Sequence, residues 1–223
     1  MRHGLRTNAV RAFVSRMTEI LVFAQQKGGA GKTTLLVQLA HAFTARGRRV
    51  RLVDLDPQGS LSRWAALRND PALPCEAAPD WQATTALKRA GRGADLVLVD
   101  LPGAADVLLR AAIRAASHVL IPLQPSPLDA WATRPTLEVC AREKASHFIV
   151  LNRVPPRGGA IDAALAEVSA PVLPAQLGAR VAFSNAFLEG RAAAEIAPRS
   201  KAAEEAAALA DAVEALSEKI PTR

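Results

Sequence analysis

The sequence predicts an α/β protein in which a mostly parallel sheet carries helices on both of its faces. Two observations lead to this fold class. Short, mainly apolar runs recur along the 223 residues, and each has the length of a strand buried in a sheet. Segments with helical periodicity separate these runs, as expected when helical crossovers join parallel strands. No internal repeat or low-complexity linker interrupts the pattern, so residues 17–223 are expected to form a single domain.

The first two strands and the first two helices are predicted from apolar patterns and from the residues that end them. Residues 20–24 are all apolar and predict a buried strand. A helix is expected over residues 32–46, because apolar residues line one face and Gly47 can end it. Residues 50–53 predict the second strand, and residues 61–67 a return to helix.

The middle of the chain continues the alternation after one irregular stretch. Residues 69–80 contain three prolines, and only a short strand near Cys75 is expected there. Further helices are predicted at 81–90, 104–115 and 128–144, and further strands at 96–99, 118–122 and 147–151.

A last helix is indicated by an apolar stripe. Its members recur at alternating steps of four and three residues: Leu209, Val213, Leu216 and Ile220. A helix that lies on a membrane would combine such a stripe with a basic polar face. Here the polar residues are mainly acidic, namely Glu204, Glu205, Asp211, Glu214 and Glu218 against Lys201 and Lys219. We therefore expect the stripe to pack on the sheet, and we expect no membrane partner.

Positive charge is concentrated at the N-terminus. The formal net charge is +7, and Arg2, Arg6, Arg11 and Arg16 supply four positives without an acid, which leaves about +3 (7 minus 4) for the rest. We interpret residues 1–16 as a basic extension that is either disordered or an over-extended start before Met17. The functional alternative is an arm that contacts DNA phosphates or a partner.

The cysteines and hydropathy point to a cytoplasmic protein. Cys75 and Cys140 lie far apart and show neither CxxC nor metal-ligand spacing, which favours reduced thiols. No apolar run approaches the length of a membrane span, and no secretory leader pattern is visible.

A phosphate-binding loop is the most informative motif. Residues 27–34 read Lys-Gly-Gly-Ala-Gly-Lys-Thr-Thr and lie between the first strand and the first helix. Glycines let backbone N–H groups point at phosphates, a lysine neutralises their charge, and a hydroxyl can bind magnesium. Lys32 and Thr33 fill the last two roles, whereas Gln26 stands where the usual pattern begins with glycine. The motif predicts a fold of the P-loop NTPase type that binds ATP and Mg²⁺.

The loop resembles the deviant Walker A motif of the ParA/MinD family of P-loop ATPases, because Lys27 adds a second lysine. In that family the extra lysine reaches across a dimer interface to the nucleotide of the partner. The resemblance implies that Lys27 acts in trans, that Lys32 holds phosphate in cis, and that Thr34 contacts the α-phosphate. The implied loop contacts to ATP are Lys27, Gly28, Gly29, Ala30, Gly31, Lys32, Thr33 and Thr34.

Three further segments carry the same resemblance. The segment from Asp54 to Gly59 is similar to the first switch, in which Asp56 would position the attacking water and Asp54 would support the magnesium shell. The segment ending at Asp100 resembles a Walker B strand, and this carboxylate would hold magnesium through water. Asn152 and Arg153 resemble the segment that contacts adenine. The implied catalytic residues are Lys27, Lys32 and Asp56, and the implied metal ligands are Thr33, Asp54, Asp56 and Asp100.

The resemblance implies a ParA-like ATPase without an N-terminal helix-turn-helix domain. ATP would drive homodimerisation and nonspecific binding to double-stranded DNA, so that the protein associates with the nucleoid. A cargo-bound ParB-like or adaptor protein would stimulate hydrolysis and release. The candidate DNA contacts are Arg180, Arg191, Arg199 and Lys201. Two alternatives stay open: a metabolic enzyme that uses ATP to activate a small molecule, and a nucleotide-bound scaffold without useful turnover.

Overall fold

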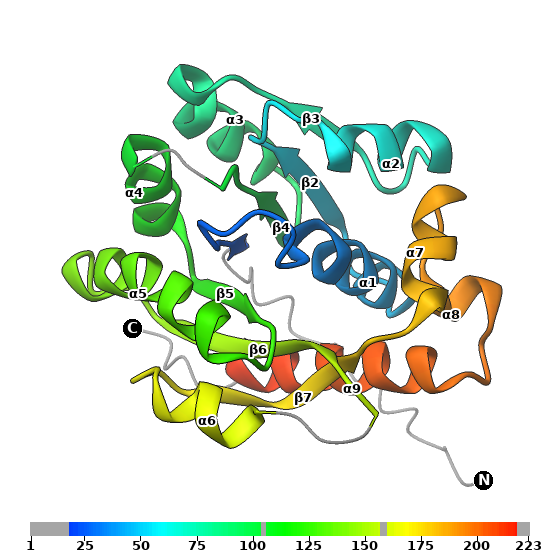
Figure 1. Ribbon diagram of the computed structural model, residues 1–223. Coiled ribbons are helices and arrows are strands. Elements are labelled where there is room, and N and C mark those ends of the chain that lie inside the picture. The colour runs from blue at the N-terminus through cyan, green and yellow to red at the C-terminus, as the bar shows by residue number, and fades with distance from the viewer. Residues whose placement is uncertain (1–17, 104–105, 157–159, 218–223) are drawn as a thin grey trace, which may run out of the picture.

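The computed structural model describes residues 18–103, 106–156 and 160–217. The expectations for residues 1–16, for the start of the helix at 104–115 and for Ile220 lie outside this part of the chain. The described residues form a seven-stranded, all-parallel sheet with helices on both faces (Figure 1). The predicted fold class is confirmed.

Strands and helices alternate along the chain. The strands are β1 (Glu19–Phe23), β2 (Val50–Asp54), β3 (Cys75–Ala77), β4 (Leu96–Asp100), β5 (His118–Leu123), β6 (His147–Val154) and β7 (Val172–Gly178). The helices are α1 (Lys32–Ala45), α2 (Ser60–Arg68), α3 (Ala83–Ala90), α4 (Asp106–Ala115), α5 (Pro127–Arg142), α6 (Ile161–Ala166), α7 (Val181–Leu188), α8 (Ala193–Ile196) and α9 (Lys201–Ser217), with a single 3₁₀ turn η1 (Asp80–Gln82) before α3.

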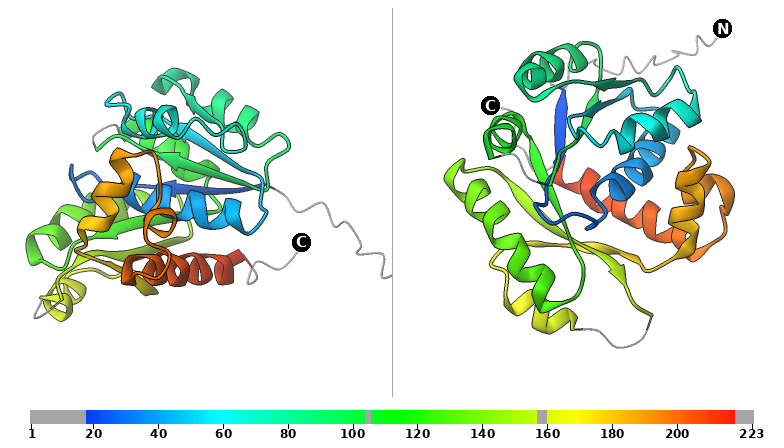
Figure 2. Two further views of the ribbon diagram at one scale, coloured as in Figure 1. Left: turned by 90° about the vertical axis from the view of Figure 1, so that its right-hand side faces the viewer. Right: turned by 45° about the horizontal axis from the view of Figure 1, so that its top comes forward.

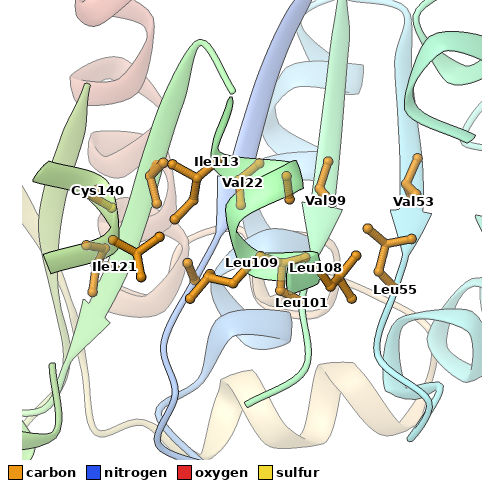
Figure 3. Close-up of a cluster of buried hydrophobic side chains, with 14 of the residues drawn as sticks. Val22, Val53, Leu55, Val99, Leu101, Leu108, Leu109, Ile113, Ile121 and Cys140 are labelled. Carbon is orange, nitrogen blue, oxygen red and sulfur yellow. The ribbon is translucent and has the colours of Figure 1, made fainter. Parts of the chain in front are cut away.

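Two hydrophobic layers enclose the sheet, whose strand order is β3-β2-β4-β1-β5-β6-β7. One layer packs α3, α4, α5 and α6 against one face, and the other packs α1, α2, α7, α8 and α9 against the opposite face (Figures 1 and 2). Figure 3 shows part of the first layer, in which Leu108 and Leu109 of α4 lie against side chains from the central strands. The buried strands are apolar on both sides for this reason.

The register of the central strands places polar groups at one edge of the sheet. Phe23 of β1 pairs with Asp100 of β4, and Asp54 of β2 pairs with the same Asp100. Because parallel strands end at one edge, the loop after β1 and the carboxylates that end β2 and β4 come together there. Asp100 therefore shares one site with the loop, although 67 positions of the sequence separate it from Thr33.

The sequence did not reveal the elements between residues 160 and 197. Strand β7 alternates exposed and buried positions, unlike the almost wholly buried central strands β1, β4 and β5, and Pro174 interrupts its pattern. It is an edge strand with register shifts against β6, and an edge strand tolerates a proline because one side of its backbone has no ladder partner. The helices α6, α7 and α8 have at most eight residues each and are too short to show a clear period.

The apolar stripe of the last helix packs on the sheet, as predicted. Leu209 and Val213 are buried among residues of α1 and β7, and Leu216 lies at the margin of the same cluster. Arg46, the residue that follows α1, forms ion pairs with Asp211 and Glu214, which hold the acidic face of α9 beside the end of the first helix. Among the helices described, none is long and apolar enough to cross a membrane.

We expect the change Leu209→Ala to lower the free energy of unfolding by about 2–5 kcal/mol, because it removes a fully buried side chain and leaves a cavity. Chemical denaturation monitored by circular dichroism measures this quantity. The control is Leu128→Ala, which truncates a leucine that is 68% exposed and should change stability by less than about 0.5 kcal/mol. Equal effects of the two changes would contradict the packing described for α9.

Candidate functional site

The phosphate loop spans the turn from the end of β1 to the start of α1. Gly29 and Gly31 have positive φ angles of 76° and 96°, a conformation that favours glycine. A side chain at Gly31 would also collide with the amide of Asn152, which donates a 2.8 Å hydrogen bond from Nδ2 to the carbonyl oxygen of Ala30. The loop is thus shaped by its own glycines and supported from β6.

Lys32 and Thr33 occupy the first turn of α1, where backbone N–H groups favour anions. The Nζ of Lys32 is buried and donates to the carbonyl oxygen of Gln25 at 3.2 Å. The hydroxyl of Thr33 donates to Oδ2 of Asp100 at 2.5 Å. Lys32 and Thr33 of the phosphate loop thus lie beside Asp100, the carboxylate that ends the Walker B-like strand.

The carboxyl group of Asp100 is fully buried, and burial raises its pKa to about 7. The hydrogen bond from Thr33 and the charge of Lys32 oppose this rise, whereas Asp54 and Asp56 add to it. Oδ1 of Asp100 has no hydrogen-bond partner among the described residues. A buried carboxylate oxygen without a partner is costly for the fold and is available for a ligand.

The residues present fit a magnesium ion that arrives with a nucleotide. Magnesium at phosphate sites is held by one or two protein oxygens and takes its other ligands from phosphates and water. Thr33 and the partnerless Oδ1 of Asp100 supply such oxygens. Within the described residues, no group of three or more His, Cys, Asp or Glu side chains is arranged to hold a metal ion.

Asp54 supports the first switch segment through hydrogen bonds. Its Oδ1 accepts from the backbone N–H of Asp56 at 3.1 Å, and its Oδ2 accepts from the backbone and hydroxyl of Ser62 at 2.8 and 2.7 Å. Both oxygens of this buried carboxylate are thus engaged in joining β2 to the start of α2. Its role as a metal ligand stays a prediction.

Asp56 lies in the turn between β2 and α2, where its Oδ1 accepts from the backbone of Gln58 at 2.9 Å. It borders a cavity of about 740 Å³, which the phosphate loop bounds together with Pro57, Pro102, Gly103, Arg153 and residues of α7. Gly103 approaches the loop so closely that a Cβ there would lie 2.8 Å from the carbonyl oxygen of Gln26. The cavity is within the usual range for small-molecule sites.

Lys27 is oriented differently from Lys32. Its Nζ lies 2.7 Å from Oδ1 of Asp129 on α5, its side chain is 41% exposed, and it does not line the cavity. Asp129 also accepts a hydrogen bond from Ser126, the residue that caps α5. Sequence reasoning missed Asp129, although serine followed three positions later by an acid is the pattern of a capping box.

Additional polar residues join the loop and the residues before it to α5 and to the turn that precedes α5, and none of these contacts was predicted. Gln25 is buried and donates from Nε2 to the hydroxyl of Thr133 at 2.8 Å, while Gln124 donates to the carbonyl oxygen of Gly29 at 3.1 Å. An isolated glutamine in a sequence carries no signal of such a role. The partners become apparent only when β5 and α5 pack beside β1.

Asn152 and Arg153, the predicted adenine contacts, lie near the end of β6 beside the loop. The amide of Asn152 is already engaged, because its Nδ2 donates to Ala30 and its Oδ1 accepts from the backbone of Arg153. Arg153 borders the cavity and has a positive φ angle of 52°. The structure therefore gives Asn152 a supporting role, and its contact with adenine stays a prediction.

The four candidate DNA contacts differ in their surroundings. Arg180 forms two hydrogen bonds with Glu205 at 2.5 and 2.8 Å, Lys201 pairs with Glu204 at 2.8 Å, and Arg191 lies 3.6 Å from Glu189. Arg199 is exposed and has no ion pair within the described part of the chain. Carboxylates offset the charge of three candidates, which sequence reasoning could not foresee.

The fold and the loop define a P-loop nucleotide-binding protein. The family described as "CobQ/CobB/MinD/ParA nucleotide binding domain" matches residues 21–193. The chain belongs to this family, and it is a ParA-like ATPase. The resemblance noted in the sequence is confirmed.

Curated relatives match most of the chain. The maintenance of carboxysome distribution protein A of Halothiobacillus neapolitanus is 33% identical over 195 residues, which cover 82% of this chain and 90% of that protein. The protein of the same name from Gloeobacter kilaueensis is 38% identical over 184 residues, covering 79% and 84%. Protein ParA of Rhizobium radiobacter is 31% identical over 184 residues, covering 77% and 83%.

Solved structures share the fold. The septum site-determining protein MinD of Pyrococcus horikoshii, in complex with Mg-ADP, has a TM-score of 0.71 at 22% identity and covers 92% of this chain and 100% of its own. A Cyanothece McdA variant in complex with ATP has a TM-score of 0.73 at 16% identity, covering 93% and 100%. At these identities the likeness concerns the fold alone.

Asp100→Asn should stabilise the nucleotide-free protein more at pH 8 than at pH 6. The folded-state pKa of this carboxyl is raised, so folding favours its protonated form, and the cost of burying its charge is relieved as the pH falls through about 7. At pH 8 each kcal/mol that the substitution adds to the free energy of unfolding should raise the melting temperature by roughly 2–4 °C. Thermal unfolding in EDTA measures the difference, and a variant that loses stability equally at both pH values would refute this account of Asp100.

Proposed function

We propose that this ATPase forms an ATP-dependent homodimer that binds DNA nonspecifically and positions a DNA or protein cargo on the nucleoid. A partner protein on the cargo stimulates hydrolysis, and the dimer then separates and leaves the DNA. The proposal is supported by the similarity to proteins named for carboxysome distribution and to Protein ParA.

Lys27 is the observation that carries this proposal. Lys32 borders the cavity and serves the phosphates of its own chain, whereas the ammonium of Lys27 lies outside the cavity against Asp129. Within one chain this second lysine contacts Asp129 rather than the cavity, so its ammonium does not border the phosphate site of its own subunit. Two ATP-bound subunits that approach each other would concentrate negative charge, and a half-exposed lysine at the edge of the loop can neutralise it.

Hydrolysis needs few groups beyond those that hold the phosphates. In-line attack depends mainly on positioning and on charge neutralisation. Asp56 borders the cavity and orients the attacking water, Lys32 neutralises phosphate charge, and Thr33 with Asp100 would hold Mg²⁺. The bound Mg²⁺ would supply further neutralisation of the phosphate oxygens.

DNA binding is proposed as a phosphate-directed, sequence-independent interaction. The net charge of +7 favours it. Arg191, Arg199 and Lys201 are exposed and are therefore more suitable for substitution than Arg180. Arg180 is less suitable, since its Glu205 partner also accepts from the backbone of Gly178, and a change would disturb the junction of β7 and α9.

Lys27→Ala should weaken ATP-dependent dimerisation at least about tenfold while leaving ATP binding by the monomer within about twofold. The reason is that the ammonium acts on the nucleotide of the partner rather than on its own. Analytical ultracentrifugation measures dimerisation, and fluorescent-nucleotide titration measures binding. Lys88→Ala, an exposed lysine on α3, is the matched control. A wild-type protein that stays monomeric with ATP would overturn the proposed function.

Asp56→Ala should slow ATP hydrolysis by at least about 100-fold, because the water loses its orienting carboxylate. The ATP dimer should then persist on random-sequence DNA, with an affinity that falls steeply as salt increases. Steady-state phosphate release and fluorescence anisotropy of labelled DNA test both points, with Asp162→Ala as the control. Normal turnover by Asp56→Ala would remove Asp56 from its proposed role, and DNA affinity indifferent to ATP and salt would count against the positioning function.

A further inference from the structure

A second hollow lies on the far side of the first switch segment. This groove of about 690 Å³ has mainly apolar walls, formed by Leu55, Pro57, Ala78, Pro79, Pro102 and Leu108. We call it the switch groove. It lies between the ends of β2 and β3 and the start of α4, and nothing in the proposed ATP cycle described so far uses it.

The switch groove shares a wall with the nucleotide cavity. Asp56, Pro57 and Pro102 border both hollows, so the first switch segment and the turn after β4 form the partition between them. Two of these residues are prolines, whose φ angle is fixed, so the partition resists local bending and is expected to move as a unit. A ligand that fills the groove would therefore contact and displace the segment that carries Asp56.

The floor of the switch groove is part of the packed core, whereas the partition lies between two hollows and has room to move. Leu55, Ala78 and Leu108 belong to the hydrophobic layer beneath α3 and α4. In Figure 3 Leu55 and Leu108 lie with Leu101 in this layer near the ends of β2 and β4. Close-packed side chains of this kind yield little to pressure, so an occupant would displace the partition in preference to the floor.

Apolar side chains are also exposed at residues that adjoin the groove lining in the sequence. Trp81, which follows the lining residue Asp80, is 78% exposed, and Val107, which precedes the lining residue Leu108, is 85% exposed. An exposed tryptophan next to a groove lined by apolar residues is typical of a protein-binding surface, where aromatic residues provide much of the binding energy.

The charge of the switch groove is of one sign. Asp54, Asp56 and Asp80 line it, and among the described lining residues there is no lysine or arginine. Asp80 is exposed at the rim, where its Oδ1 accepts from the backbone of Trp81 at 2.8 Å. Complementarity thus favours a cationic occupant and opposes an acidic one.

We propose that the switch groove binds an apolar polypeptide segment with at least one basic side chain, belonging to the partner protein that stimulates hydrolysis. Its apolar residues fill the groove beside Trp81, and its basic group pairs with Asp80. By pressing on Pro57 and Pro102 it changes the position of Asp56, which couples docking to turnover. The inference rests on the proposed function and names the class of partner and the place where it acts.

A displayed library of random peptides of about 12 residues, selected against the full chain with a non-hydrolysable ATP analogue, supplies the probe. The enriched peptides, made synthetically, should combine apolar and basic residues. They should raise ATP hydrolysis several-fold and change the fluorescence of the wild-type chain but not of Trp81→Phe.

The variant Ala77→Arg/Asp80→Lys places bulk and positive charge at the groove, because Ala77 is an exposed lining residue of β3. It should weaken peptide binding at least about tenfold and abolish stimulation. The matched control Asp162→Lys/Ala163→Arg makes the same changes at exposed positions of α6, beside the opposite edge of the sheet, and should bind peptide like the wild type.

Each remaining outcome overturns the inference. These outcomes are no enrichment, peptides that bind both double variants equally, and peptides that bind the groove without changing turnover. A double variant with impaired ATP-dependent dimerisation would instead assign the groove to the contact between subunits. Nucleotide binding and dimerisation of the wild type, measured in parallel, separate failure of the groove from failure of the proposed function.

Discussion

Burial of the Asp100 carboxyl group against Thr33 is the constraint around which this site is built. A carboxylate at the centre of a parallel sheet costs free energy, and one of its oxygens has no partner in the part of the chain described. The cost is tolerated because β1 and β2 flank β4 on either side and hold the loop and the first switch in fixed register with it. A site that is unfavourable when empty is well suited to bind a cation with its phosphates.

Close contacts around this carboxyl group leave little freedom to the loop. Gly31 fits against Asn152, Gly103 fits against the carbonyl of Gln26, and Asp54 fixes both ends of the first switch turn. The first two contacts join segments that are distant in the sequence, whereas the hydrogen bonds of Asp54 are local. The consequence is a preorganised phosphate site, whose donors need not be assembled when the nucleotide arrives.

Ion pairing divides the charged residues of the protein into two groups. Arg180 and Lys201 are offset by neighbouring carboxylates, whereas Lys32 and Arg199 have no carboxylate partner within the described residues. Lys27 belongs to the first group in this structure, since Asp129 holds it. In a dimer the phosphates of the partner would compete with that carboxylate, so the same lysine could serve one contact in the single chain and another between two chains.

The sequence by itself determined the loop, the parallel α/β fold and the family, because these depend on local features: glycines that permit one turn, apolar runs of strand length, and helical stops. Only the tertiary structure decided how the side chains are used. It engaged the amide of Asn152 with Ala30, paired Lys27 with Asp129, and revealed β7, whose edge position permits Pro174. It also created the wall that the nucleotide cavity and the switch groove share. The physical reason is that such contacts depend on which distant segments the sheet order makes neighbours, and no local pattern in the chain records that order.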